Sequence, residues 1–165
     1  MRAALLMLSL LALLPAAPAL ASPSGVDLHA YWDSRCKDCH GHAGDFARRT
    51  LATADGSLQG RHHRTGLSQF LKQHYLADSL VVPVTEMLIA QVSASPVFSS
   101  RCAGCHGTAA EFARRSLVVK EGVLTGRRSD RPVVGYLESH GGLAPAERPV
   151  MIDTLERVLR EVGGS

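Results

Sequence analysis

Two stretches of this sequence, SRCKDCHG at residues 34–41 and SRCAGCHG at residues 100–107, differ at only two of their eight positions. Residues 34–74 align without a gap onto residues 100–140, with 18 identities in 41 positions at a constant offset of 66. The same offset also brings Pro83-Val84 onto Pro149-Val150. Because self-similarity at a fixed offset indicates an internal duplication, we expect the two halves of the chain to fold alike.

Length and composition limit what the chain can be. It has 165 residues, of which 45% are hydrophobic and 20% are charged, and its formal net charge is +3. This composition is too apolar for a disordered chain, and the length allows only one or two small domains. The net charge is mild for a nucleic-acid-binding protein and no long Lys/Arg tract is present, so we expect no nucleic-acid partner.

The duplication also predicts how the chain is divided. We expect a signal peptide over residues 1–21, a first domain over residues 22–92, a linker over residues 93–97 and a second domain over residues 98–165. Each unit then has about 65–70 residues, a size at which a hydrophobic core alone rarely gives a stable fold. We therefore expect a disulfide, a metal or a cofactor inside each half.

The N-terminal residues have the features of a secretion signal. Arg2 precedes an apolar run over residues 3–14, and Ala19-Leu20-Ala21 has the small-x-small form of a cleavage site. At 1.5 Å per residue, the run spans about 18 Å, short of the roughly 30 Å hydrocarbon core of a bilayer. An uncleaved membrane anchor is the alternative. We expect export to the periplasm, cleavage after Ala21 and no membrane span in the mature chain.

The remaining patterns predict a mostly α-helical fold. A short helix is expected before each cysteine stretch, and Ser95-Pro96 has the form of an N-cap followed by Pro at the first helical position. Helical apolar periodicity covers residues 67–76, 84–92 and 150–162, and the last two segments are expected to close the two halves. Residues 117–124 have the pattern of a small hairpin or an irregular loop.

All four cysteines of the chain belong to the two repeated stretches. A histidine follows each pair directly, which gives Cys36, Cys39 and His40 in the first stretch and Cys102, Cys105 and His106 in the second. Cys-x-x-Cys-His is the attachment motif of c-type haem. Two thiols on one turn can form thioether bonds to the two vinyl groups of one porphyrin, and the adjacent histidine can then ligate the iron. We predict two covalently bound haem c groups, one in each half.

Three other uses of these cysteines are possible. A four-cysteine zinc site usually has its two pairs about 15–20 residues apart, whereas here the pairs lie in separate repeats. Disulfides suit an exported protein but leave the two following histidines unexplained. A thioredoxin-like redox pair needs a βαβ setting, and no strand pattern precedes either motif.

With these two motifs, the chain resembles a dihaem c-type cytochrome made of two tandem small class I cytochrome c-like haem domains. The resemblance covers nearly the whole chain after residue 21. Its specific part is the pair of motifs, and the remainder matches in helix order and length. The resemblance implies electron transfer between redox partner proteins in the periplasm. It also implies a distal iron ligand before the last helix of each domain, where this family usually has a methionine.

The distal ligand is where this chain departs from the family. Neither Met87 nor Met151 recurs at the 66-residue offset, and both fall in the predicted closing helices, where core packing is the simpler role. His74 and His140 do recur, each 34 residues after the predicted proximal histidine. Because neutral imidazole is a good iron ligand, we predict bis-histidine ligation and potentials below those of Met/His cytochromes c. The alternative is that both histidines are surface residues at the ends of parallel helices.

The other histidines do not align with a second histidine. His62 and His63 are the alternative distal ligands in the first half, and His29 and His42 have no predicted role. We expect all four to be solvated.

Duplicated aromatic and basic residues surround the motifs. Phe46 and Phe112 follow the predicted proximal histidines by six residues and are expected to pack against the porphyrin. Guanidinium groups bind carboxylates through two parallel hydrogen bonds, so at least one arginine per half could hold a haem propionate. The duplicated candidates are Arg48, Arg49 and Arg61 in the first half and Arg114, Arg115 and Arg127 in the second.

These observations favour a periplasmic dihaem electron carrier without substrate turnover of its own. The alternative is a haem enzyme, or a cytochrome subunit of a larger oxidoreductase, in which one iron has an open position. A haem sensor is a further possibility, since it needs the same haem sites.

Overall fold

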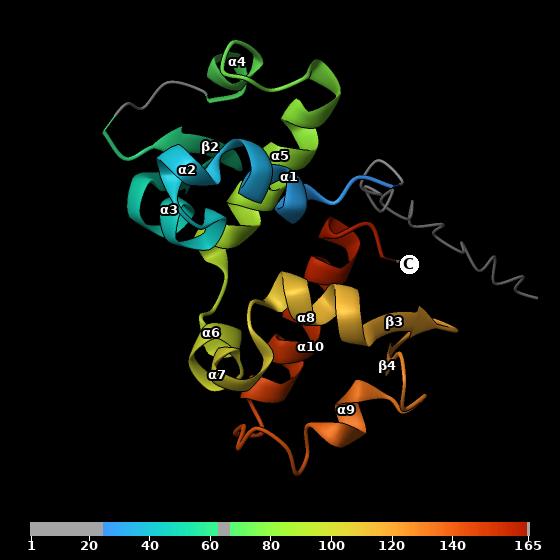
Figure 1. Ribbon diagram of the computed structural model, residues 1–165. Coiled ribbons are helices and arrows are strands. Elements are labelled where there is room, and N and C mark those ends of the chain that lie inside the picture. The colour runs from blue at the N-terminus through green and yellow to red at the C-terminus, as the bar shows by residue number, and fades with distance from the viewer. Residues whose placement is uncertain (1–24, 63–66, 165) are drawn as a thin grey trace, which may run out of the picture.

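The computed structural model describes residues 25–62 and 67–164. The predicted signal peptide, including the cleavage site after Ala21, and His63 lie outside the described residues. Within them the molecule is mostly helical, and each half adds one small antiparallel hairpin. Figure 1 shows the two halves as two lobes that are joined between helices α5 and α6.

The first half begins with three short helices and ends with a long one. A two-stranded hairpin and a further short helix lie between them. The elements are α1 (Leu28–Arg35), α2 (Lys37–His40), α3 (Ala43–Thr50), β1 (Leu51–Ala54), β2 (Ser57–Gly60), α4 (Leu67–Lys72) and α5 (Asp78–Ser93). In the hairpin, Leu51 pairs with Gly60 and Ala54 with Ser57, and Asp55 and Gly56 turn with positive φ.

The second half repeats these elements in the same order. They are α6 (Val97–Arg101), α7 (Ala103–His106), α8 (Ala109–Ser116), β3 (Leu117–Lys120), β4 (Val123–Gly126), α9 (Val133–Tyr136) and α10 (Glu147–Glu161). The bounds of α7, α8, β3 and β4 differ from those of their first-half counterparts by 66 residues at both ends. The predicted feature at residues 117–124 is therefore a hairpin, and its counterpart at residues 51–60 has the same pairing register.

Each half has its own core of buried apolar side chains. In the first half, Trp32 and Leu51 pack with Val84 and Leu88 of α5. In the second half, Phe98 and Leu117 pack in the same way with residues of α10. The methionines Met87 and Met151 are both 1% exposed, as expected for core residues. No helix among the described residues has the length and apolar character needed to cross a bilayer.

Three helix starts differ from the sequence-based expectation, and α10 begins at Glu147 rather than at Val150. Helix α5 begins at Asp78 rather than near Val84, because Pro83 is accommodated inside the helix instead of ending it. Pro96 is the N-cap of α6 and not its first residue. In α10, Pro149 lies in the first turn, where its missing N–H has no helical acceptor to lose.

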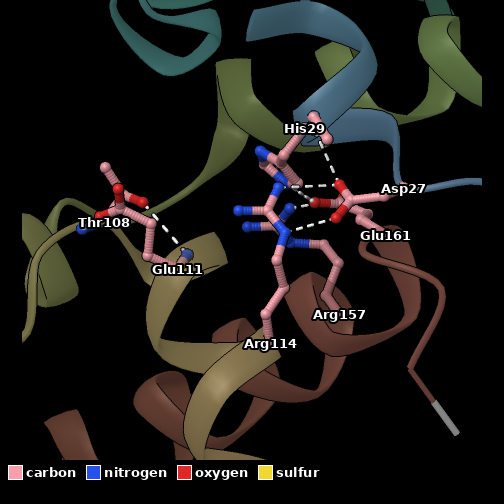
Figure 2. Close-up of polar contacts among 8 residues, drawn as sticks. Asp27, His29, Thr108, Glu111, Arg114, Arg157 and Glu161 are labelled. Atoms are coloured by element: carbon pink, nitrogen blue, oxygen red, sulfur yellow. Dashed lines mark hydrogen bonds and ion pairs between the residues drawn. The ribbon is translucent and has the colours of Figure 1, made fainter.

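The residues around α1 connect the first half to the second (Figure 2). Asp27 forms an ion pair with Arg114 of α8 through both carboxylate oxygens, and Arg114 Nη2 lies 2.9 Å from Asp27 Oδ1. His29 Nε2 lies 2.8 Å from Glu161 Oε2, and Arg157 Nη1 lies 2.6 Å from Glu161 Oε1. The prediction that His29 is solvated is therefore wrong. Its side chain is only 15% exposed, because it packs against a carboxylate that lies 132 residues further along the chain.

Candidate cofactor sites

A single helical turn sets the geometry of the first Cys-x-x-Cys-His motif. Cys36 caps the N-terminus of α2, and its carbonyl oxygen accepts hydrogen bonds from Cys39 N at 3.2 Å and His40 N at 2.9 Å. Gly41 ends the turn with φ 71° while donating to the Lys37 carbonyl at 2.8 Å. Residues three and four apart share one face of a helix, so both thiols and the imidazole project to the same side.

The second motif has the same construction. Cys102 caps α7, His106 N donates to its carbonyl oxygen at 3.0 Å, and Gly107 ends the turn with φ 74°. All four cysteines are free thiols in the structure. The two cysteine pairs belong to separate halves, and each pair is followed directly by its own histidine.

The fold brings the predicted distal histidine to the proximal histidine in both halves. The ring centroids of His40 and His74 are 5.9 Å apart with an interplanar angle of 61°, and those of His106 and His140 are 6.0 Å apart with an angle of 65°. His74 lies in the turn after α4, and its N–H donates to the Leu71 carbonyl at 3.1 Å. His140 lies in the turn after α9.

This spacing fits a metal ion between the two rings. Metal–imidazole bonds of about 2 Å on either side of one ion put the two ring centroids roughly 6 Å apart. Among the described residues, no group of three or more His, Cys, Asp or Glu side chains is arranged to hold a metal ion. Each half therefore offers two imidazole side chains that could ligate one metal ion.

Aromatic side chains support each histidine. Phe46 packs on His40 with ring centroids 4.6 Å apart, and Phe112 packs on His106 at 4.7 Å. Phe70 stacks on His74 at 4.6 Å. Ring packing of this kind restricts the rotation of the imidazoles, so the histidine pairs are held in position by neighbouring side chains.

A cavity of about 440 Å³ in the second half contains most of that half's predicted ligands. Cys102, His106 and His140 line it, together with the buried Met151 and Phe112. This volume lies within the roughly 300–1,000 Å³ range of small-molecule sites, and the wall is mostly apolar, as such sites require. The cavity therefore suits a largely apolar group with access to both imidazoles.

Most of the duplicated arginines have partners within the protein. Arg61 Nη2 donates to the Arg48 carbonyl of α3 at 2.9 Å, whereas Arg127 Nη2 donates to the Leu117 carbonyl at the start of β3 at 2.6 Å. Arg48 pairs with Asp45 on its own helix at 2.8 Å. Arg114 pairs with Asp27. Each of these four arginines therefore has a partner within the protein and stabilises the fold.

Three other arginines line the cavity of the second half: Arg115, Arg128 and Arg131. Sequence reasoning missed Arg128 and Arg131, because it considered only residues that recur at the 66-residue offset. The aligned residues in the first half are His62, which is exposed, and Thr65. A signal was nevertheless present, since both arginines lie in the short segment between the hairpin and the distal histidine.

Burial changes the protonation of the motif side chains. It lowers the pKa of His40, and the neighbouring His74 lowers it further. Burial likewise raises the pKa of the Cys36 and Cys102 thiols, with a smaller contribution from the second cysteine of each motif. His40 is therefore favoured in the neutral form, which is the form that can ligate a metal.

Comparison with known proteins identified no relative of this chain. No family model matches the chain, and neither does any curated protein or solved structure.

Proposed function

We propose that this protein is a periplasmic dihaem c-type cytochrome that carries electrons between redox partner proteins. Cys36, Cys39, Cys102 and Cys105 would hold the two haems covalently, with His40 and His106 as proximal ligands and His74 and His140 as distal ligands. The observation that carries the proposal is the close approach of two histidine rings beside each Cys-x-x-Cys-His turn. The ring centroids lie 5.9 Å apart in the first half and 6.0 Å apart in the second.

The arrangement of the histidines favours a carrier over an enzyme. When bound, each haem supplies an iron that cycles between the ferric and ferrous states. If both histidines of each half ligate the iron, the iron would have no free position for a substrate. His74 and His140 also replace the methionine that raises the potential of Met/His cytochromes c, so both potentials are expected to be lower.

The export of the protein is supported by its N-terminal sequence. Arg2, the apolar run over residues 3–14 and the Ala19-Leu20-Ala21 site are typical of a cleaved secretion signal. An exported protein meets the machinery that attaches haem outside the cytoplasm, so the signal and the two motifs belong to one hypothesis.

The proposal is tested on the protein purified from a periplasmic fraction. We expect an intact mass that exceeds the mass of residues 22–165 by two haems, and a low-spin absorption spectrum for both. The Cys36→Ala, Cys39→Ala variant should contain one haem, which supplies the matched control. A mass with bound zinc, or with two disulfides and no porphyrin, would overturn the proposal. High-spin bands that shift with CO would instead favour the enzyme or sensor alternatives.

A further inference from the structure

The cavity of the second half combines an apolar wall with a cationic edge. Among its lining residues are Phe112, Leu117 and Leu155, together with Arg115, Arg128 and Arg131. No Asp or Glu lines this cavity, all of whose lining residues lie in the described part of the chain. A site with this combination of groups matches a ligand that is apolar over most of its surface and carries carboxylates on one side.

The three guanidinium groups are available for such a ligand. Arg115 donates to the His106 carbonyl through Nη2 at 3.2 Å, which leaves its other N–H groups free to bind. Neither Arg128 nor Arg131 forms a side-chain hydrogen bond or ion pair with any residue between 25 and 62 or between 67 and 164. All three side chains are exposed, so their charges face solvent at the mouth of the cavity.

The loop after β4 holds two of these arginines in place. Gly126 N donates to the Arg131 carbonyl at 2.9 Å, and Asp130 N donates to the Gly126 carbonyl at 2.9 Å. Lys120 of β3 forms an ion pair with Asp130, and Thr125 forms a β-bridge with Pro132. The loop is thus closed by backbone hydrogen bonds and attached to the hairpin, so Arg128 and Arg131 are presented by an ordered segment.

We propose that Arg115, Arg128 and Arg131 bind the propionate carboxylates of the haem in the second half and thereby raise its reduction potential. The inference rests on the proposed dihaem function. A carboxylate near the iron favours the ferric form, because the ferric centre carries one more positive charge than the ferrous one. Arginines that pair with the propionates offset this effect. Arg115 has a counterpart in the first half, Arg49, but the positions aligned with Arg128 and Arg131 are His62 and Thr65, which have no permanent charge. The effect of Arg128 and Arg131 therefore belongs to one of the two haems.

A redox titration of the intact dihaem protein tests this assignment. Arg128→Gln and Arg131→Gln, combined, should lower one of the two midpoint potentials and leave the other unchanged. We expect about a tenfold change in the equilibrium between the reduced and oxidised forms of that haem, which is about 59 mV for a one-electron couple. Arg128→Lys with Arg131→Lys keeps both charges but loses the two-pronged geometry, so it should give a smaller shift in the same direction.

Arg160→Gln is the matched control. Arg160 is an exposed residue of α10 that does not line the cavity, so its replacement should move neither potential. The inference is overturned if the double Gln variant leaves both potentials unchanged, or shifts both equally. A protein that contains no covalent haem would instead refute the proposed function itself, and the mass measurement separates that result from a failure of this inference.

Discussion

At the scale of single residues, the two halves keep the same histidine pairs but support them with different neighbours. In the first half, Trp32 Nε1 donates to the Gly41 carbonyl at 2.9 Å and so ties the end of the motif turn to α1. The aligned residue in the second half is Phe98, whose side chain has no hydrogen-bond donor and packs against Phe112 and the core. The position of the histidine pair is the same in both halves despite this difference, so the local turn and the ring contacts suffice to place it.

Replacing the distal histidines tests their role directly. His74→Ala is expected to open the iron of the first haem and leave the second six-coordinate, because each half has its own pair. His140→Ala should do the same to the second haem. The measurement is the fraction of high-spin haem, together with the amount of CO bound by the reduced protein. We expect half of the haem to respond in each variant.

His42→Ala is the control for these variants. His42 is an exposed histidine of the first half that contacts neither ring pair, so both haems should stay low-spin. If His74→Ala or His140→Ala also stays fully low-spin and binds no CO, the assignment fails for that haem.

At the scale of elements, the same helix has a different N-terminus in each half. Thr108 caps α8 by accepting a hydrogen bond from Glu111 N at 3.2 Å, and the Glu111 carboxylate accepts one from Thr108 N at 2.9 Å (Figure 2). The aligned N-cap of α3 is His42, whose side chain makes no capping hydrogen bond. Because α8 and α3 each follow a Cys-x-x-Cys-His motif, this capping box stabilises the start of only one of the two helices.

The capping box predicts a difference between two otherwise equivalent substitutions. Thr108→Ala should lower the free energy of unfolding by about 1 kcal/mol, because it leaves the Glu111 N–H without its side-chain acceptor. His42→Ala removes no capping bond and should change it by less than about 0.5 kcal/mol. Denaturant unfolding of both variants measures the difference. Equal effects would contradict the role assigned to Thr108.

At the scale of the whole molecule, two aligned arginines, Arg48 and Arg114, form different ion pairs in the two halves. Arg48 pairs with Asp45 on its own helix, and both side chains are largely exposed. Its counterpart Arg114 instead reaches Asp27, which belongs to the other half and precedes it by 87 residues. Together with the contact between His29 and Glu161, this ion pair joins the start of the first half to α8 and α10 of the second (Figure 2).

The Asp27 ion pair predicts a dependence of stability on pH. Burial alone would raise the pKa of Asp27, but hydrogen bonds from Arg114 and Ala30 N and the charge of Arg114 outweigh it and hold the pKa below its usual value of 3.8. The ionised carboxylate therefore stabilises the fold above about pH 4, and this contribution is lost as the pH falls through the lower folded-state value. Asp27→Asn keeps an N-cap side chain but removes the charge, so it should cost about 1 kcal/mol at pH 7.

Denaturant unfolding at pH 7 and at about pH 3 measures this effect. The difference between Asp27→Asn and the parent protein should shrink at the lower pH, because pH 3 lies below the ordinary pKa of 3.8 and protonation of this carboxyl in the unfolded chain offsets part of the charge contribution. Asp45→Asn is the matched control and should cost less than about 0.5 kcal/mol at either pH, since its pair with Arg48 is exposed. If Asp27→Asn lowers the free energy of unfolding by the same amount at both pH values, the lost charge is not the cause.

The sequence by itself determined the structural features that depend on the spacing of nearby residues. Its mostly helical character, the hairpin at residues 117–124 and the core role of Met87 and Met151 followed from periodicity and turn residues over a few positions. The one-turn motifs with His40 and His106 are local as well. The choice of His74 and His140 as candidate distal ligands came from the duplication, because both recur at the 66-residue offset.

Only the tertiary structure decided which charged groups meet. Asp27 and Arg114 are 87 residues apart in the sequence and His29 and Glu161 are 132 residues apart, and no periodicity or short motif connects them. Among the duplicated arginines, only packing showed that Arg114 joins the halves while Arg115 reaches the cavity. Long polar side chains act several ångströms from their own backbone, so their partners are set by how helices and loops pack and not by neighbours in the sequence.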